Sequence, residues 1–313
     1  MIWVGWRQQR AETLIAAAIL AVLAAALLPS GLHMASVYHH DGLASCLGRN
    51  PSLACEDAIG NFTSQFESLS NLVAWATILP GLIGAVLAAP FVLDLEHGTY
   101  RLAWTQSITR RRWITNKVAL AVAAAIVAAA ALTAFLTWWR QPLIHLNGRM
   151  DNAVFDSTGT VVVGYVLFAL GLALVVGVLW RRAVPALVVA FAVYMAGRIF
   201  VDTWLRQHLV SQVTATWHGR TLQPTALNHA WVLTEGPSDK FGHALPPAIM
   251  LCSKAQLAAG HCPAIKRGSD YLHAVYIPAS RFWELQGIET AMFGGVALVL
   301  IALAAWWTHE RVG

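Results

Sequence analysis

The charged residues between positions 94 and 117 are the side chains best suited to a specific task, because they stand between two long apolar runs. The segment opens with Asp94 and Glu96, and its basic members are Arg101, Arg110, Arg111, Arg112 and Lys117. Basic residues gathered at the ends of membrane-length segments mark the cytoplasmic side of a membrane. The pattern therefore predicts a short docking element inside the cell, through which a partner could move both neighbouring spans.

A second group of charges lies within an apolar run. Arg198 and Asp202 are four residues apart, which places them on one face of a helix and predicts an ion pair. At a rise of about 1.5 Å per residue, Arg198 would lie roughly 22 Å beyond Ala183, in the outer quarter of the hydrocarbon layer, where a charge is costly. Two interpretations remain open: the pair lines a transport pathway, or Arg198 snorkels and is neutralised by its helical neighbour.

Glu284 and Glu289 precede the last apolar run, where they either face a substrate or pair with Arg281 and other outer basic residues. Proline removes a backbone hydrogen bond, so Pro80 and Pro90 predict a kinked second span that could act as a gate. The candidate pathway or gate residues are Trp75, Pro80, Arg198, Asp202, Glu284 and Glu289.

Catalytic patterns are not found in the sequence. It has no Gly-Lys pair, hence no phosphate-binding loop, and no H-E-x-x-H or G-x-S-x-G motif. We therefore expect no ATPase activity, catalytic residue or metal site on this chain.

The four cysteines, Cys46, Cys55, Cys252 and Cys262, fall in the expected outer loops. Three pairings are possible. We favour Cys46 with Cys55 and Cys252 with Cys262, because each pair closes a loop of about ten residues in an oxidising compartment. A zinc site with His39, His40 and His261 is the alternative, disfavoured because the cysteines lack C-x-x-C spacing.

The composition indicates a membrane protein of several spans: 57% of residues are hydrophobic, 12% are charged, and the mean hydropathy is +0.56. A spanning helix needs roughly 20 apolar residues. Six runs qualify, at residues 13–32, 72–93, 118–138, 161–180, 183–203 and 290–307. We expect an all-α, polytopic single domain over residues 1–313. Outer loops are expected at 33–71, interpreted as a small polar lid, and at 204–289, where 217–247 is loop-like.

Basic residues predict the orientation. Ten Lys or Arg fall in segments that six spans place inside, against three in the two shorter outer loops, so both termini should be cytoplasmic in the plasma membrane. Trp3, Trp6, Arg7 and Arg10 predict an interfacial helix at the N-terminus. A cleaved signal peptide is the alternative for the first run, but it is long and five further spans follow it.

These features resemble permease subunits of bacterial ATP-binding-cassette transporters of the type-2 exporter family. The resemblance rests on three runs, namely Trp6-Arg7-Gln8-Gln9-Arg10, Glu96-His97-Gly98-Thr99-Tyr100-Arg101 followed by Arg110-Arg111-Arg112-Trp113, and Pro278-Ala279-Ser280-Arg281-Phe282-Trp283 with Glu289. The Glu-x-Gly-Thr segment between two spans is the most specific of these. The family would have six spans, a cytoplasmic coupling helix between the second and third spans, and a large outer insert before the sixth.

The resemblance implies a working unit of two permease subunits, here a homodimer, and two cytoplasmic ATPase subunits that bind ATP and Mg. The segment 96–115 would dock on the ATPase, with these coupling residues: Glu96, Gly98, Thr99, Arg101, Arg110, Arg111 and Arg112. Gly98 would allow a sharp turn, Thr99 would cap the next helix, and Glu96 would pair with a basic residue of the partner or with Arg101.

The exported compound is expected to be apolar or amphiphilic, such as a drug, antibiotic or lipid-like molecule, because the spans offer mainly apolar side chains. Nothing indicates nucleic acid as a partner. Two alternatives stay open at this point: a permease-like sensor or immunity subunit without transport, and an intramembrane lipid-modifying enzyme that would use Glu284, Glu289 and loop histidines.

Overall fold

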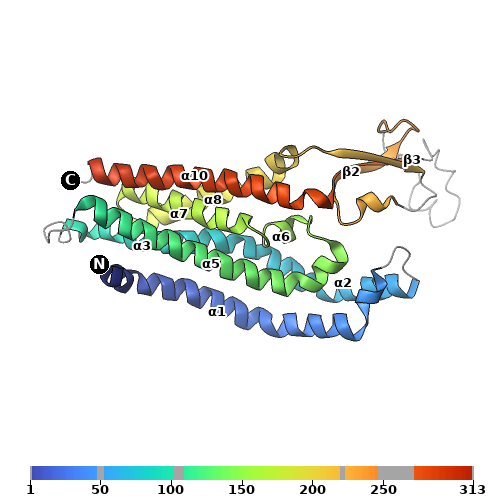
Figure 1. Ribbon diagram of the computed structural model, residues 1–313, viewed down its shortest axis with the longest axis horizontal. Coiled ribbons are helices and arrows are strands. Elements are labelled where there is room, and N and C mark those ends of the chain that lie inside the picture. Colours follow the sequence, from blue (N-terminus) through green and yellow to red (C-terminus); the bar gives the residue numbers. More distant parts are fainter. Residues whose placement is uncertain (1, 48–52, 102–108, 219–222, 246–270, 312–313) are drawn as a thin grey trace, which may run out of the picture.

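The computed structural model describes residues 2–47, 53–101, 109–218, 223–245 and 271–311, with the side chains of 2–12 left aside. It is an elongated bundle of long helices with a small sheet at one end (Figure 1). Both chain ends lie at the opposite end of the bundle (Figure 1). We call these two ends the sheet end and the terminal end.

The six predicted spans are confirmed within the described residues, where six helical stretches are long and apolar enough to cross a membrane. They are Thr13–His40, Leu53–His97, Arg110–Asn147, Val161–Trp180, Ala183–His208 and Ala279–Arg311. Several of these helical stretches are longer than the predicted spans, because the polar residues next to the apolar runs are helical as well.

Helix α7 (Val161–Trp180) forms the centre of the bundle. Its twenty residues include no charge, and most of them are buried. Around it pack α3 (Leu79–His97), α5 (Arg110–Asn147), α8 (Ala183–Phe200) and α10 (Phe282–Arg311), while α1 (Ile2–His40) lies along α5. A helix that is apolar on all sides belongs in the middle of such a bundle, because every face can be covered.

Small residues let α3 approach α7 closely. A Cβ added at Gly84 would lie 2.5 Å from the Val166 carbonyl oxygen and 2.8 Å from the Leu170 nitrogen, both backbone atoms of α7. Helices in membranes rely on such close contacts, since lipid offers no hydrophobic drive for association.

Replacing Gly84 by alanine is therefore expected to destabilise the protein by about 1–3 kcal/mol, because backbone cannot move aside as a flexible side chain does. Gly294 in α10 is the matched control, since its added Cβ meets no described atom within 4 Å. Gly294→Ala should be neutral or stabilising by up to about 1 kcal/mol through helix propensity. Thermal unfolding in detergent measures both, and equal midpoints would refute the packing argument.

The segment 33–71, expected to be a polar loop, is mostly helical. Helix α1 continues to His40, and α2 (Leu53–Ala74) fills most of the remaining segment. Phe62, Phe66 and Val73 recur at helical spacing, and all three are buried in the main core. This apolar stripe stabilises α2, a helix that was not predicted because the segment is polar overall. Cys46, at the end of the 3-10 turn η1 (Leu43–Cys46), and Cys55, in the first turn of α2, form a disulfide.

The second span is irregular next to Pro80, one of the two prolines from which a kink was predicted. A 3-10 turn, η2 (Trp75–Ile78), separates α2 from α3, and Pro80 follows in the first turn of α3, where its missing N–H costs nothing. Pro90 lies inside α3. Trp75, the first residue of η2, is 73% exposed.

The predicted loop at 204–289 contains a small antiparallel sheet, so the expected all-α class is too narrow. Within the described residues its strands are β1 (Val213–His218), β2 (Trp231–Ser238) and β3 (Tyr271–Ile277), in the order β1-β3-β2. Trp217, Leu227 and Tyr276 form a separate small core on it. Alternating β-branched and aromatic residues explain these strands. They were not predicted because the surrounding segment is rich in Gly, Pro and His.

Cys252 and Cys262 lie outside the described residues.

The predicted interfacial helix is not a separate element, since residues 2–12 continue into α1 without a break.

Candidate functional site

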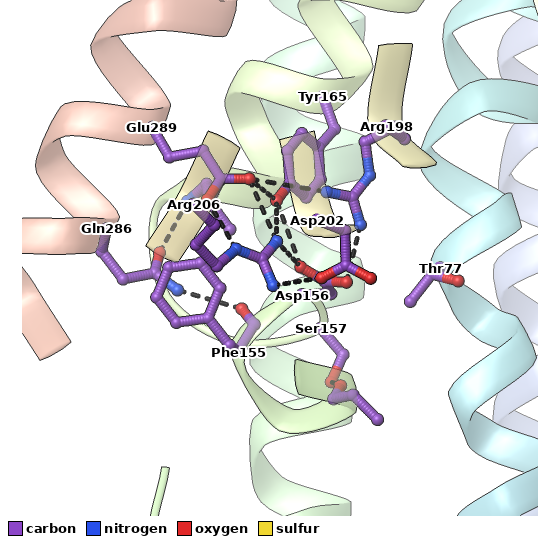
Figure 2. Close-up of polar contacts among 12 residues, drawn as sticks. Thr77, Phe155, Asp156, Ser157, Tyr165, Arg198, Asp202, Arg206, Gln286 and Glu289 are labelled. Atoms are coloured by element: carbon purple, nitrogen blue, oxygen red, sulfur yellow. Dashed lines mark hydrogen bonds and ion pairs between the residues drawn. The ribbon is translucent and has the colours of Figure 1, made fainter. Parts of the chain in front are cut away.

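Charged side chains from separate segments meet inside the sheet end of the bundle (Figure 2). They come from the connection after the short helix α6 (Asn152–Phe155), from the start of α7, from the end of α8 and the turns after it, and from α10. We call the group the charge cluster, and its members are Asp156, Tyr165, Arg198, Asp202, Arg206 and Glu289.

Arg206 binds three carboxylates. Its Nη2 lies 2.5 Å from Asp156 Oδ1, and its Nη1 lies 2.6 Å from Asp202 Oδ1. Its Nε donates to Glu289 Oε2 at 3.0 Å. The side chain is 1% exposed, and its guanidinium carbon lies 4.5 Å from the centre of the Phe155 ring. A buried guanidinium is tolerated only when its donors are used in this way.

Arg198 binds the same two buried carboxylates from the other side. Its Nη2 lies 2.7 Å from Asp156 Oδ2, whereas its Nη1 lies 3.5 Å from Glu289 Oε1 without a hydrogen bond. The guanidinium stacks on the Tyr165 ring at 3.7 Å, and the Tyr165 hydroxyl donates to Glu289 Oε1 at 2.5 Å. Two arginines of one segment therefore hold two carboxylates from two other segments.

A π-helical turn, η3 (Val201–Leu205), lies between the two arginines. In an uninterrupted α-helix, residues eight positions apart differ by about 80° in direction. The wider π turn reduces this difference, so Arg206 returns to the side on which Arg198 lies. Such turns are frequent at functional sites.

The structure contradicts the predicted Arg198–Asp202 pair. Arg198 binds Asp156 and Glu289, while Asp202 binds Arg206 one turn later. Partners from distant segments are more completely buried than Asp202, so they compensate the buried guanidinium better.

Glu284 and Glu289 do not share one environment. Glu284 is exposed and lies 3.4 Å from Arg281, as one of the two predicted interpretations has it. Glu289 is fully buried in the charge cluster. The two carboxylates therefore do not converge as an intramembrane lipid-modifying enzyme would need. Within the described residues no set of His, Cys, Asp or Glu side chains has the arrangement of a metal site.

Gln286 fixes α10 to the start of α7 beside the charge cluster (Figure 2). Its Oε1 accepts from the Val161 backbone N–H at 3.0 Å, and its Nε2 donates to the carbonyls of Phe155 at 2.9 Å and Thr158 at 3.1 Å. The amide thus caps α7 and holds the connection that carries Asp156. No sequence pattern singled out Gln286, Asp156, Tyr165 or Arg206.

At the terminal end, Glu96 connects α3 to α8. Its Oε2 accepts a hydrogen bond from the Ala183 backbone N–H at 2.8 Å. Ala183 is the first residue of α8, where a carboxylate satisfies an unpaired N–H and interacts favourably with the helix dipole. Glu96 was expected to pair with Arg101 or with a basic residue of the partner. In the structure the Arg101 Nε instead donates to the Tyr100 hydroxyl at 3.4 Å.

Asp94 connects α3 to α5, because its Oδ2 accepts from the buried Nζ of Lys117. Gly98 ends α3 in the left-handed conformation, with φ of 70°, which makes the sharp turn that the sequence predicted. The Thr99 hydroxyl donates to Asp94 Oδ1 at 2.8 Å, and most of the next helix, which Thr99 is expected to cap, falls outside the described residues.

Arg110, Arg111 and Arg112, which we call the triple arginine, are the first three residues of α5. All three side chains are exposed at the terminal end. Arg111 Nε donates to His309 Nε2 of α10 at 3.3 Å. Residues 102–108, in the middle of the expected coupling segment 96–115, lie outside the described residues. The structure thus brings Glu96, Gly98, Thr99, Arg101 and the triple arginine to one end of the bundle, and the charge cluster to the other.

A comparison with protein families identifies a match over most of the bundle. A family described as ABC-2 membrane transporter related matches residues 17–206, more than half of the chain. The chain belongs to this ABC-2 membrane transporter related family. Comparisons with curated proteins and with solved structures each gave no significant match.

Family membership confirms the resemblance to ABC-2 permease subunits and identifies a multi-pass membrane protein that partners with ABC ATPase subunits. The matched region includes both ends of α8. It contains Glu96 and Ala183 at the terminal end, and Asp156, Arg198 and Arg206 of the charge cluster. Glu289 and the sheet lie beyond it.

Proposed function

We propose that this ABC-2 chain is the membrane-spanning subunit of an ATP-driven exporter, working by alternating access as a homodimer with two ATPase subunits. In this proposal the terminal end is cytoplasmic, as the basic residues there favour. The ATPases bind ATP and Mg, and the chain moves an apolar or amphiphilic compound toward the sheet end.

The observation that carries the proposal is the linkage at the terminal end. The end of α3 bonds to the first residue of α8 through Glu96 and to α5 through the Asp94–Lys117 pair. The segment that follows, from Gly98 to the triple arginine, connects α3 to α5 along the sequence. A partner that pushes on this segment therefore acts on three spans at once, which is how a closing ATPase would rearrange the bundle.

The charge cluster supports α8 as the helix that moves when the ATPase acts on the terminal end. At the terminal end α8 is held by one hydrogen bond to Glu96, and at the sheet end by the two buried arginines. Force applied to Glu96 is thus transmitted along α8 to a site that contacts α10 and the α6–α7 connection. Gly81, whose added Cβ would lie 2.5 Å from the Tyr194 ring, keeps α3 close to α8 between these two ends.

The experiment is co-purification of the chain with its ABC ATPase subunit, sought first among the adjacent reading frames, followed by ATP hydrolysis in lipid nanodiscs. We expect a stable complex whose hydrolysis is stimulated by apolar or amphiphilic compounds and not by sugars or inorganic ions. Stimulation by a sugar or an ion alone would refute the substrate class. An ATPase that neither binds nor responds to the chain would refute the exporter assignment.

A further inference from the structure

Arg140 is a buried charge that forms no ion pair with the charge cluster. It lies near the sheet end of α5 and is 1% exposed. Its Nε and Nη2 are enclosed, yet neither has a hydrogen-bond partner among the described residues. A buried guanidinium without partners costs more than a neutral group in the same position, so such a side chain requires an explanation.

The carboxylates that interact electrostatically with Arg140 are Asp151 and Asp156. Asp151 is exposed, and its Oδ1 already accepts from the N–H groups of Ala153 and Val154 as the cap of α6. Asp156 is buried, as Arg140 is, and follows α6 directly. Of the two, Asp156 is the one whose pairing would compensate a buried charge.

We propose that Arg140 is the alternative partner of Asp156, so that the Asp156 carboxylate exchanges Arg198 of α8 for Arg140 of α5 when the bundle changes conformation. The structure then represents the state in which α8 is held. In the second state Arg198 of α8 is released from the α6–α7 connection and α5 is held there through Arg140, while Arg206 continues to bind Asp156 Oδ1. As a step of transport this rests on the proposed function, whereas the exchange itself requires no ATPase.

The exchange leaves no charge of the cluster without a partner. Arg198 Nη1 already lies 3.5 Å from Glu289 Oε1, so a small approach would turn this contact into a hydrogen bond. Arg206 keeps Glu289 at 3.0 Å and Asp202 at 2.6 Å. Arg140 gains the partner that it lacks. Two arrangements with comparable numbers of ion pairs are what a two-state element needs.

The test measures the distance between α5 and α8 in the full chain in nanodiscs. Spin labels are placed at Gln141, beside Arg140, and at Ile199, beside Arg198, both of which are exposed. They are attached through ketone-bearing unnatural amino acids, because the chain has four native cysteines. In the wild-type background we expect two distance populations.

Arg140→Gln should leave only the population of the present structure, and it should also raise the unfolding temperature, because an unpaired buried charge is removed. Arg198→Lys should favour the other population. Thr133→Val is the matched control: the Thr133 hydroxyl is a second buried polar group of α5 without a partner, and it is uncharged. This variant should keep both populations.

If Arg140→Gln and Arg198→Lys both leave the wild-type distribution unchanged, the exchange is refuted. If Asp151→Asn reproduces the shift that Arg140→Gln causes, Asp151 is the partner of Arg140 and the exchange is also refuted. Addition of the ATPase and ATP separates the two proposals. Populations that respond to Arg140→Gln but not to ATP would refute the proposed function and leave the exchange standing.

Discussion

Replacing Glu289 by glutamine is expected to lower the free energy of unfolding by about 3–5 kcal/mol, because it removes one partner of a buried ion pair and leaves the other charged. Glu289 is 0% exposed and binds Arg206 through two atoms, at 3.0 and 3.2 Å. Glutamine keeps the shape but offers one acceptor and no charge. Chemical denaturation of the purified chain in mixed micelles measures the loss.

Glu284→Gln is the matched control for this measurement. Glu284 lies on the same helix, five residues earlier, with its side chain 53% exposed and its Oε2 3.4 Å from Arg281. Exposed pairs of this kind contribute about 0–1 kcal/mol. A loss for Glu289→Gln as small as that for Glu284→Gln would mean that the charge cluster does not stabilise this conformation.

The double variant Glu289→Gln with Arg206→Gln extends the argument. Residues in one buried network are coupled, so the double variant should lose less than the sum of the two single variants. Full additivity would indicate that Glu289 and Arg206 act on separate parts of the structure, contrary to their contacts.

The spans could be predicted from the sequence because the bilayer requires a minimum length of apolar helix, which composition alone reveals. The partners of Arg198 could not be predicted in the same way. Helical spacing identifies neighbours within one helix, and it suggested Asp202. The true partners, Asp156 and Glu289, come from segments 42 residues earlier and 91 residues later, and only bundle packing brings them together.

Arg206 and Asp156 were missed for a related reason. Both lie just outside an apolar run, where charges are ordinary, and nothing local distinguishes them from solvated residues. One signal was available: Arg198 is a charge at membrane depth, and such a charge requires a buried carboxylate. A search for carboxylates at the sheet-end boundaries of the other spans would have included Asp156 and Glu289.

Helix α8 links the two parts of the candidate site. Its first N–H is bound by Glu96 of α3. Its last turn carries Arg198, and the turns that follow it carry Arg206. Coupling between distant sites requires an element with two arrangements that both sites influence. The exchange proposed for Asp156 would give α8 these two arrangements, and Glu96 is where the ATPase side would influence them.

Replacing Glu96 by alanine is accordingly expected to reduce ATP-driven transport by about 5–150-fold, the range of ordinary coupling free energies. The free energy of unfolding should fall by only about 0.5–2 kcal/mol, as for loss of a helix cap. ATP hydrolysis by the complex should continue, because the ATPase sites are untouched. Transport into vesicles and hydrolysis are measured on the same preparation.

Glu96→Gln separates the hydrogen bond from the charge, since its carbonyl oxygen can still accept from the Ala183 N–H at the present 2.8 Å position. We expect it to retain most of the transport, with a loss of about 0.3–1 kcal/mol from the weaker helix-dipole interaction. His97→Ala, an exposed neighbour, is the control and should behave as wild type. Normal transport by Glu96→Ala, or equal losses of transport and hydrolysis, would show that the Glu96 bond to α8 does not carry the coupling.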